Sequence, residues 1–121
     1  MLDHKPLPPP SRIQLDPGQL RTVQTILAQH LPAATVMAFG SRVGGNPRKY
    51  SDLDLAVMVR QGQEPLTLRT LRHLKESFED SNLPICVDIV DWALADSSFK
   101  QAVTAQGMAA VQGLATHYLV Q

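Results

Sequence analysis

Residues 37–59 read MAFGSRVGGNPRKYSDLDLAVMV and hold most of the chemistry of this 121-residue chain. A short apolar, β-branched run at residues 35–39 stops at a Gly-Ser pair, and a longer apolar run begins after Asp52. This order predicts a strand, a glycine turn, a polar loop and a second strand. The second run stops alternating beyond Leu55, which indicates a strand that is covered on both faces and lies centrally in its sheet.

Two acidic residues stand at the start of the second predicted strand. Because side chains alternate between the faces of a strand, Asp52 and Asp54 project on the same side. Their charges repel each other unless a cation neutralises them, and hard oxygen ligands at close spacing suit Mg²⁺ or Mn²⁺. The pair therefore predicts a divalent-metal site.

The glycine turn supplies groups that suit phosphate. Gly40 lets the backbone come close to a ligand, and Ser41 offers a hydroxyl and an amide N–H beside the guanidinium of Arg42. A phosphate-binding turn next to a metal-binding pair predicts a nucleoside triphosphate site.

A third strand is predicted at residues 85–90, and it carries another acid. If this strand neighbours the second one, Asp88 approaches Asp52 and Asp54, and three carboxylates converge. The alternative is that Asp88 is a surface acid on an edge strand, which its apolar neighbours disfavour.

Helices are predicted between and after these strands. Asp16 caps a first helix that has Pro17 at its first position and ends at Pro32. Pro65 starts a second helix, whose core-facing stripe consists of Leu68, Leu71, Leu74 and Phe78. Asp91 caps a helical turn at residues 92–95. Ser97 or Ser98 caps a last helix that Gly107 closes.

The two ends of the chain are less informative. Residues 1–15 are rich in proline and predict an extended arm, which is either a loose leader, the favoured interpretation, or a strap for a partner. Residues 16–121 have the length of a single domain. The tail at residues 108–121 contains two short candidate strands and is not assigned further.

Composition excludes several classes of protein. Lys plus Arg and Asp plus Glu number 11 each, so there is no global basic field and no direct nucleic-acid partner is expected. The single cysteine, Cys86, excludes an internal disulfide framework, fits a reducing cytoplasm and is expected to be a small buried residue. No run reaches membrane-spanning length, so membrane insertion is not expected. The four histidines lack metal-ligand spacing.

These motifs resemble those of a known family. Gly40-Ser41, a gap of about a dozen residues, and then Asp52-Leu53-Asp54 resemble the signature of the nucleotidyltransferases related to DNA polymerase β. With Arg42 after the serine and VDIVD at residues 87–91, the chain resembles the minimal nucleotidyltransferases, many of which are antitoxins paired with HEPN-domain toxins. The resemblance implies an α/β (α+β) fold in which helices flank a small mixed sheet.

The resemblance also implies roles for the motif residues. Asp52 and Asp54 would hold two Mg²⁺ ions, and Asp88 would complete one of these sites and act as general base. Gly40 and Ser41 would hold the β- and γ-phosphates of ATP, and Arg42 would stabilise the leaving pyrophosphate.

The implied activity is transfer of AMP from ATP to a hydroxyl, expected to be a tyrosine, of a HEPN ribonuclease toxin in the cytoplasm. One domain of this size leaves no separate module for recognising an elaborate acceptor, so the acceptor brings its own binding surface. Two alternatives remain: an antitoxin that only occludes its partner, and a transferase acting on a small-molecule hydroxyl.

Overall fold

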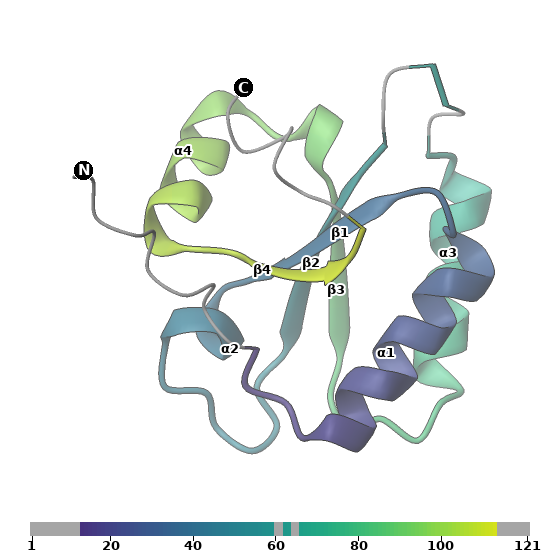
Figure 1. Cartoon of the computed structure of the whole chain (residues 1–121), viewed down its shortest axis with the longest axis vertical. Coiled ribbons are helices and arrows are strands. Elements are labelled where there is room, and N and C mark those ends of the chain that lie inside the picture. Colours follow the sequence, from purple (N-terminus) through teal and green to yellow (C-terminus); the bar gives the residue numbers. More distant parts are fainter. Residues whose placement is uncertain (1–12, 60–61, 64–65, 114–121) are drawn as a thin grey trace, which may run out of the picture.

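The computed structural model describes residues 13–59, 62–63 and 66–113, and it has one mixed sheet with helices on both faces (Figure 1). The strands have the order β3-β2-β1-β4, in which β1 is antiparallel to β2 and β4, and β2 is parallel to β3. Along the chain the elements are α1 (Pro17–His30), β1 (Thr35–Phe39), α2 (Ser41–Gly44), β2 (Leu53–Met58), α3 (Leu68–Glu79), β3 (Val87–Asp91), the 3-10 turn η1 (Trp92–Leu94), α4 (Ser97–Gln106) and β4 (Ala109–Gln112). The predicted fold class is confirmed.

The strand β2 is central, as its unbroken apolar run predicts. It pairs with β1 on one side and β3 on the other, and all of its residues except Asp54 are buried. Among the described residues, β3 and β4 are the edge strands of the sheet. The acid on β3 is therefore on an edge strand and exposed, as the alternative interpretation expected, yet β3 also neighbours β2.

The larger core lies between the sheet and the helices α1 and α3, which run side by side over one face (Figure 1). From the helices this core takes Val23, Leu27, Leu74 and Phe78, and from the strands it takes Val36, Ala38, Leu53, Leu55, Val57 and Val87, all buried. The strand residues alternate along each strand, as a half-covered face requires.

The start of α1 follows its predicted capping. The Asp16 side chain accepts a hydrogen bond from the Gln19 amide (2.8 Å), and the Gln19 side chain accepts one from the Asp16 amide (3.3 Å). These two bonds satisfy backbone donors that have no partner within the helix. Just before the cap, Ile13 and Leu15 pack against the larger core, although the predicted arm included them. Residues 1–12 of that arm lie outside the described residues.

The prediction for α3 is partly wrong. The helix starts at Leu68 and its N-cap is Thr67, whose hydroxyl accepts from the Thr70 amide (3.1 Å), whereas Pro65 lies outside the described residues. Leu68, the expected first member of the apolar stripe, is 81% exposed, while Leu74 is buried. Six residues of helix rotate a side chain by about 120° relative to a whole number of turns, so the two leucines face different ways.

The second face of the sheet carries a smaller cluster of Met37, Ala56 and Met58, against which Phe39, Trp92 and Met108 pack. Phe99 of α4 extends this cover with an edge-on contact to Phe39, at a ring separation of 5.7 Å. This face is thus covered only in part.

Three predictions for the C-terminal half meet different outcomes. Asp91 caps η1 by accepting from the Ala93 amide (3.1 Å), and Gly107 closes α4 with a φ of +108°, both as predicted. The predicted serine caps are wrong: Asp96, whose side chain accepts from the Phe99 amide (2.8 Å), caps α4, because the cap must precede the first helical residue, Ser97.

Cys86 and the C-terminal tail differ from, or add to, what the sequence predicted. Cys86 is exposed, not buried as expected, since it immediately precedes the edge strand β3. Of the unassigned tail, residues 109–112 form β4, which pairs with β1 across an irregularity at Val36/Met37, and residues 114–121 lie outside the described residues. Within the described part of the chain, the helices are too short or too polar to cross a membrane.

Candidate active site

The sheet brings the predicted site residues to adjacent positions on three neighbouring strands. Asp54 of β2 pairs with Phe39, the last residue of β1, on one side and with Asp88 of β3 on the other. Gly40 follows Phe39 directly, so the glycine turn and Asp88 flank Asp54 from opposite sides. Asp54 shares its face of β2 with Ala56 and Met58, which places the acids on the partly covered face.

The glycine turn is packed against the acid. Gly40 has a φ of +83°, a conformation that disfavours side chains, and it is the N-cap residue of the short helix α2. A Cβ added to Gly40 would lie 2.5 Å from Oδ2 of Asp54. Glycine therefore allows the closest approach of the turn to the carboxylate that carries the predicted metal chemistry.

The three carboxylates influence one another electrostatically. Burial raises the pKa of Asp54 above its ordinary value, and the negative charges of Asp88 and then Asp52 raise it further. Asp54 is half-buried, whereas Asp52 and Asp88 are exposed. None of the three accepts a hydrogen bond or forms an ion pair within residues 13–59, 62–63 and 66–113. The acids are thus free to bind a cation from outside the chain.

The chemistry of this donor set fits Mg²⁺, since all three side chains offer hard carboxylate oxygens. The side chains do not form a ready-made metal cluster: in the described part of the chain, no three His, Cys, Asp or Glu residues are grouped so that they could hold an ion. The carboxylates repel one another, and those that are exposed can turn away from their neighbours into solvent. The metal assignment therefore stays a prediction.

Arg42 is held by hydrogen bonds to the backbone of the protein. The residue is 6% exposed, and its guanidinium donates to four backbone carbonyls. The acceptors are those of Ser51 (2.8 Å, from Nε), Gln14 (2.8 Å, from Nη1), Lys49 (3.0 Å, from Nη2) and Arg48 (3.3 Å, from Nη2). These contacts use most of its five N–H donors, so they do not match the direct pyrophosphate contact that was expected.

Gln14 is a residue of the site region that sequence reasoning missed. Its amide donates to the carbonyl of Arg42 (2.6 Å), its own carbonyl accepts from Arg42, and its side-chain Nε2 donates to the Gly45 carbonyl (3.0 Å). Nothing in the local sequence signals this, because the partners are 28 and 31 positions away.

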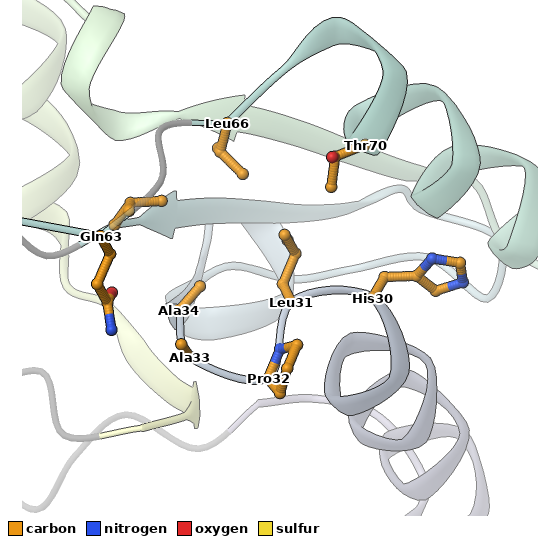
Figure 2. Close-up of a pocket in the computed structure, with 9 residues that line it drawn as sticks. His30, Leu31, Pro32, Ala33, Ala34, Gln63, Leu66 and Thr70 are labelled. Atoms are coloured by element: carbon orange, nitrogen blue, oxygen red, sulfur yellow. The ribbon is translucent and has the colours of Figure 1, made fainter.

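The sheet also has a hollow at its other end (Figure 2). It measures about 400 Å³ and lies between the turn that joins α1 to β1 and the start of α3, with Val59 after β2 in its wall. It is lined by His30, Leu31, Pro32, Ala33, Ala34, Val59, Gln63, Leu66 and Thr70, and so contains no carboxylate. Because Thr35 pairs with Met58 at this end and Phe39 with Asp54 at the other, the hollow is separate from the predicted site.

Comparison with known proteins identifies the family. The family model for the polymerase β nucleotidyltransferase domain matches residues 21–111, most of the chain, including the glycine turn and all three acids. The chain belongs to this nucleotidyltransferase family. The resemblance drawn from Gly40-Ser41 and Asp52-Leu53-Asp54 is thereby confirmed, and the protein is a nucleotidyltransferase.

Two relatives refine this placement. A protein of Haemophilus influenzae called "Probable protein adenylyltransferase MntA" is 43% identical over 93 residues, which cover 77% of this chain and 79% of that protein. It supports the assignment to the minimal nucleotidyltransferases. A solved structure described as "Crystal structure of the toxin-antitoxin with AMP-PNP" has a chain that superposes with a TM-score of 0.65, at 22% identity, covering 81% of this chain and 76% of that chain. This second likeness establishes the shared fold.

Proposed function

We propose that this nucleotidyltransferase is a Mg²⁺-dependent protein adenylyltransferase that serves as the antitoxin of a toxin–antitoxin pair. It transfers AMP from ATP to a hydroxyl, that of a tyrosine, on a HEPN-domain ribonuclease toxin, and it acts in the cytoplasm. The name of the Haemophilus influenzae relative supports protein adenylylation. The toxin–antitoxin description of the structural relative supports a toxin partner, and its AMP-PNP supports ATP as the donor.

The observation that carries the proposal is the row formed by the glycine turn, Asp54 and Asp88 across β1, β2 and β3. Displacement at a phosphorus atom requires the attacking and leaving oxygens to lie roughly in line. In the proposed complex, Ser41 and Gly40, on the β1 side of Asp54, bind the β- and γ-phosphates. Asp88, on the β3 side, would contact the acceptor hydroxyl.

In the proposed reaction, the acceptor oxygen forms a bond to the α-phosphorus of ATP. The bond from that phosphorus to the oxygen bridging the α- and β-phosphates breaks, and pyrophosphate leaves. Asp88 takes the proton of the acceptor hydroxyl, as a general base of this class does. Asp52 and Asp54 would hold two Mg²⁺ ions, with Asp88 completing one site, and such ions supply neutralisation of charge on both the attacking and the leaving oxygens.

The alternative of a purely occluding antitoxin is disfavoured by the acids themselves. Burial, and then the charges of Asp88 and Asp52, raise the pKa of Asp54, so keeping this carboxylate ionised costs stability. An antitoxin that only binds its partner would have no use for this destabilising group of acids. Transfer to a small-molecule hydroxyl is the second alternative, and no feature of the described residues favours it.

Intact-mass spectrometry of a purified HEPN toxin tests the proposal. The toxin is incubated with this protein, ATP and Mg²⁺, and a parallel reaction contains EDTA in place of Mg²⁺. We expect the toxin to gain whole AMP units only when the metal is present, with fragmentation locating them on a tyrosine. A toxin that is bound and silenced with no added mass would support occlusion, and label found only on small alcohols would support the other alternative.

A further inference from the structure

The guanidinium of Arg42 joins three separate segments around the predicted site. We call Arg42 and the backbone carbonyls of Gln14, Arg48, Lys49 and Ser51 the Arg42 carbonyl cluster. The segments are the chain before α1, the loop between α2 and β2, and the glycine turn, to which Arg42 itself belongs. Gln14 and Arg42 are 28 residues apart in sequence, so no local preference holds the first segment to the turn.

The Arg42 carbonyl cluster is adjacent in sequence to both the proposed phosphate contact and the first proposed metal ligand. Arg42 follows Ser41, the proposed phosphate contact, and Ser51 precedes Asp52, the first proposed metal ligand. The bond from Arg42 Nε to the Ser51 carbonyl is 2.8 Å long and therefore fixes the distance between the phosphate-binding turn and the chain that delivers the acids.

The surrounding contacts keep the loop in one conformation. The Ser51 hydroxyl accepts from the Arg48 amide (2.7 Å), and the Ser51 amide donates to the Arg48 carbonyl (3.1 Å). On the other side, Gln14 binds both Arg42 and Gly45. A Cβ on Gly45 would lie 3.0 Å from the Cα of Ser41, so the start of the loop packs closely on the turn.

Arg42 is also an unusual buried residue. It is buried without a carboxylate partner among the residues that the structure describes, and buried arginines are rarely left unpaired. Removing a buried charge from water is costly, and the dipoles of four carbonyls offset that cost here. An apolar side chain would fill the space but hold none of these carbonyls.

We propose that Arg42 is a positioning residue for nucleotidyl transfer: it sets the phosphate-binding turn and the acids at Asp52 and Asp54 in register without touching the nucleotide. The activity part of this inference rests on the proposed function, whereas its structural part does not. Misalignment of reacting groups lowers the reaction rate strongly, since a displacement of about 1 Å can reduce it about 100-fold.

The test compares Arg42→Met, Arg42→Lys and a control of equal stability. The control is the truncation of a buried α1 side chain, Val23→Ala or Leu27→Ala, whichever matches Arg42→Met in its unfolding midpoint. Transfer is measured per folded molecule, ATP binding by calorimetry, and exposure of the loop by amide hydrogen exchange at residues 48–52.

For Arg42→Met we expect transfer to fall by about 10- to 100-fold relative to the control, together with faster exchange at residues 48–52. Arg42→Lys keeps the charge but lacks the planar fork of five donors, so we expect an intermediate loss. A purely structural role would give Arg42→Met the same transfer, ATP affinity and loop exchange as the control, which would overturn the inference.

The same experiment separates this inference from the proposed function. If the wild-type protein modifies no acceptor, the proposed function fails, and the exchange and ATP-binding comparisons still decide on Arg42. If the wild-type protein is active and Arg42→Met matches the control in all three measurements, the inference fails and the proposed function stands.

Discussion

The two faces of β2 differ most at the start of the strand, where buried Leu53 lies on one face and Asp54 on the other, although Ala56 and Met58 further along the second face are also buried. Leu53, Leu55 and Val57 are fully or almost fully buried under α1 and α3. One position away on the other face, Asp54 is half-buried beside Asp52 and Asp88, with no partner among the described residues. The first face contributes stability, and the second keeps acids whose repulsion opposes it.

The difference predicts that stability and activity can be separated by single substitutions on one strand. Truncation of Leu53, Leu55 or Val57 should change the free energy of unfolding, whereas neutralisation of the acids should change nucleotidyl transfer.

The largest expected effect is the loss of nucleotidyl transfer in the Asp88→Asn variant. Loss of a general base typically lowers the rate by about 10²- to 10⁴-fold, and the exposed position of Asp88 should leave the fold intact. Steady-state kinetics and a thermal melt on the same preparation check both halves. Glu76→Gln, which neutralises an exposed acid of α3, is the matched control and should keep full activity.

The next largest expected effect is the loss of stability in the Leu55→Ala variant. Truncating this fully buried leucine should lower the free energy of unfolding by about 2–5 kcal/mol. Urea denaturation measures this loss. A much smaller loss would show that the core can collapse around the cavity, and would weaken the contrast between the two faces.

Gly40→Ala should affect both properties. A side chain at positive φ costs about 1–3 kcal/mol, and here it would also displace the Asp54 carboxylate. Gly62→Ala is the control, because Gly62 has a φ of +91° but nothing within 4 Å of an added Cβ. We expect only Gly40→Ala to lose transfer, and equal behaviour of the two variants would contradict the close packing of the turn on Asp54.

The smallest expected effect depends on pH. Because the pKa of Asp54 is raised in the folded protein, the fold is favoured when Asp54 is protonated and loses that stability as pH rises through the raised pKa. In EDTA, Asp54→Asn should therefore be more stable than wild type at neutral pH, by up to about 1 kcal/mol for partly exposed charges. Denaturation at several pH values should show this gain vanishing in acid, and a gain that persists there would rule out this cause.

Local patterns were enough to predict much of the fold, whereas the pairing of Asp54 with Asp88 depended on the neighbour of β3, which the sequence left open. The apolar runs located β1 and β2, and the capping pattern of Asp16 and Pro17 located α1. The apolar run of β2 identified the central strand. Each of these signals lies within a few residues of the feature that it predicts.

The errors concern features that depend on distant parts of the chain. Cys86 is exposed because of its place at the sheet edge, and Leu68 because the core covers only part of α3. The motif did not predict the contacts of Arg42, one of which is with Gln14, 28 positions earlier. Spacing within a motif cannot reveal which carbonyls fold back onto a side chain.

The most direct test measures AMP transfer and thermal stability on the same preparations. A HEPN toxin is incubated with ATP, Mg²⁺ and either the wild-type protein or its Asp52→Asn/Asp54→Asn variant, and the toxin's intact mass is measured beside a thermal melt of each protein. The account predicts AMP units on the toxin with the wild type, none with the variant, and a variant that is folded and at least as stable. Undiminished AMP transfer by a folded variant would contradict the assignment of the acid face as the active site.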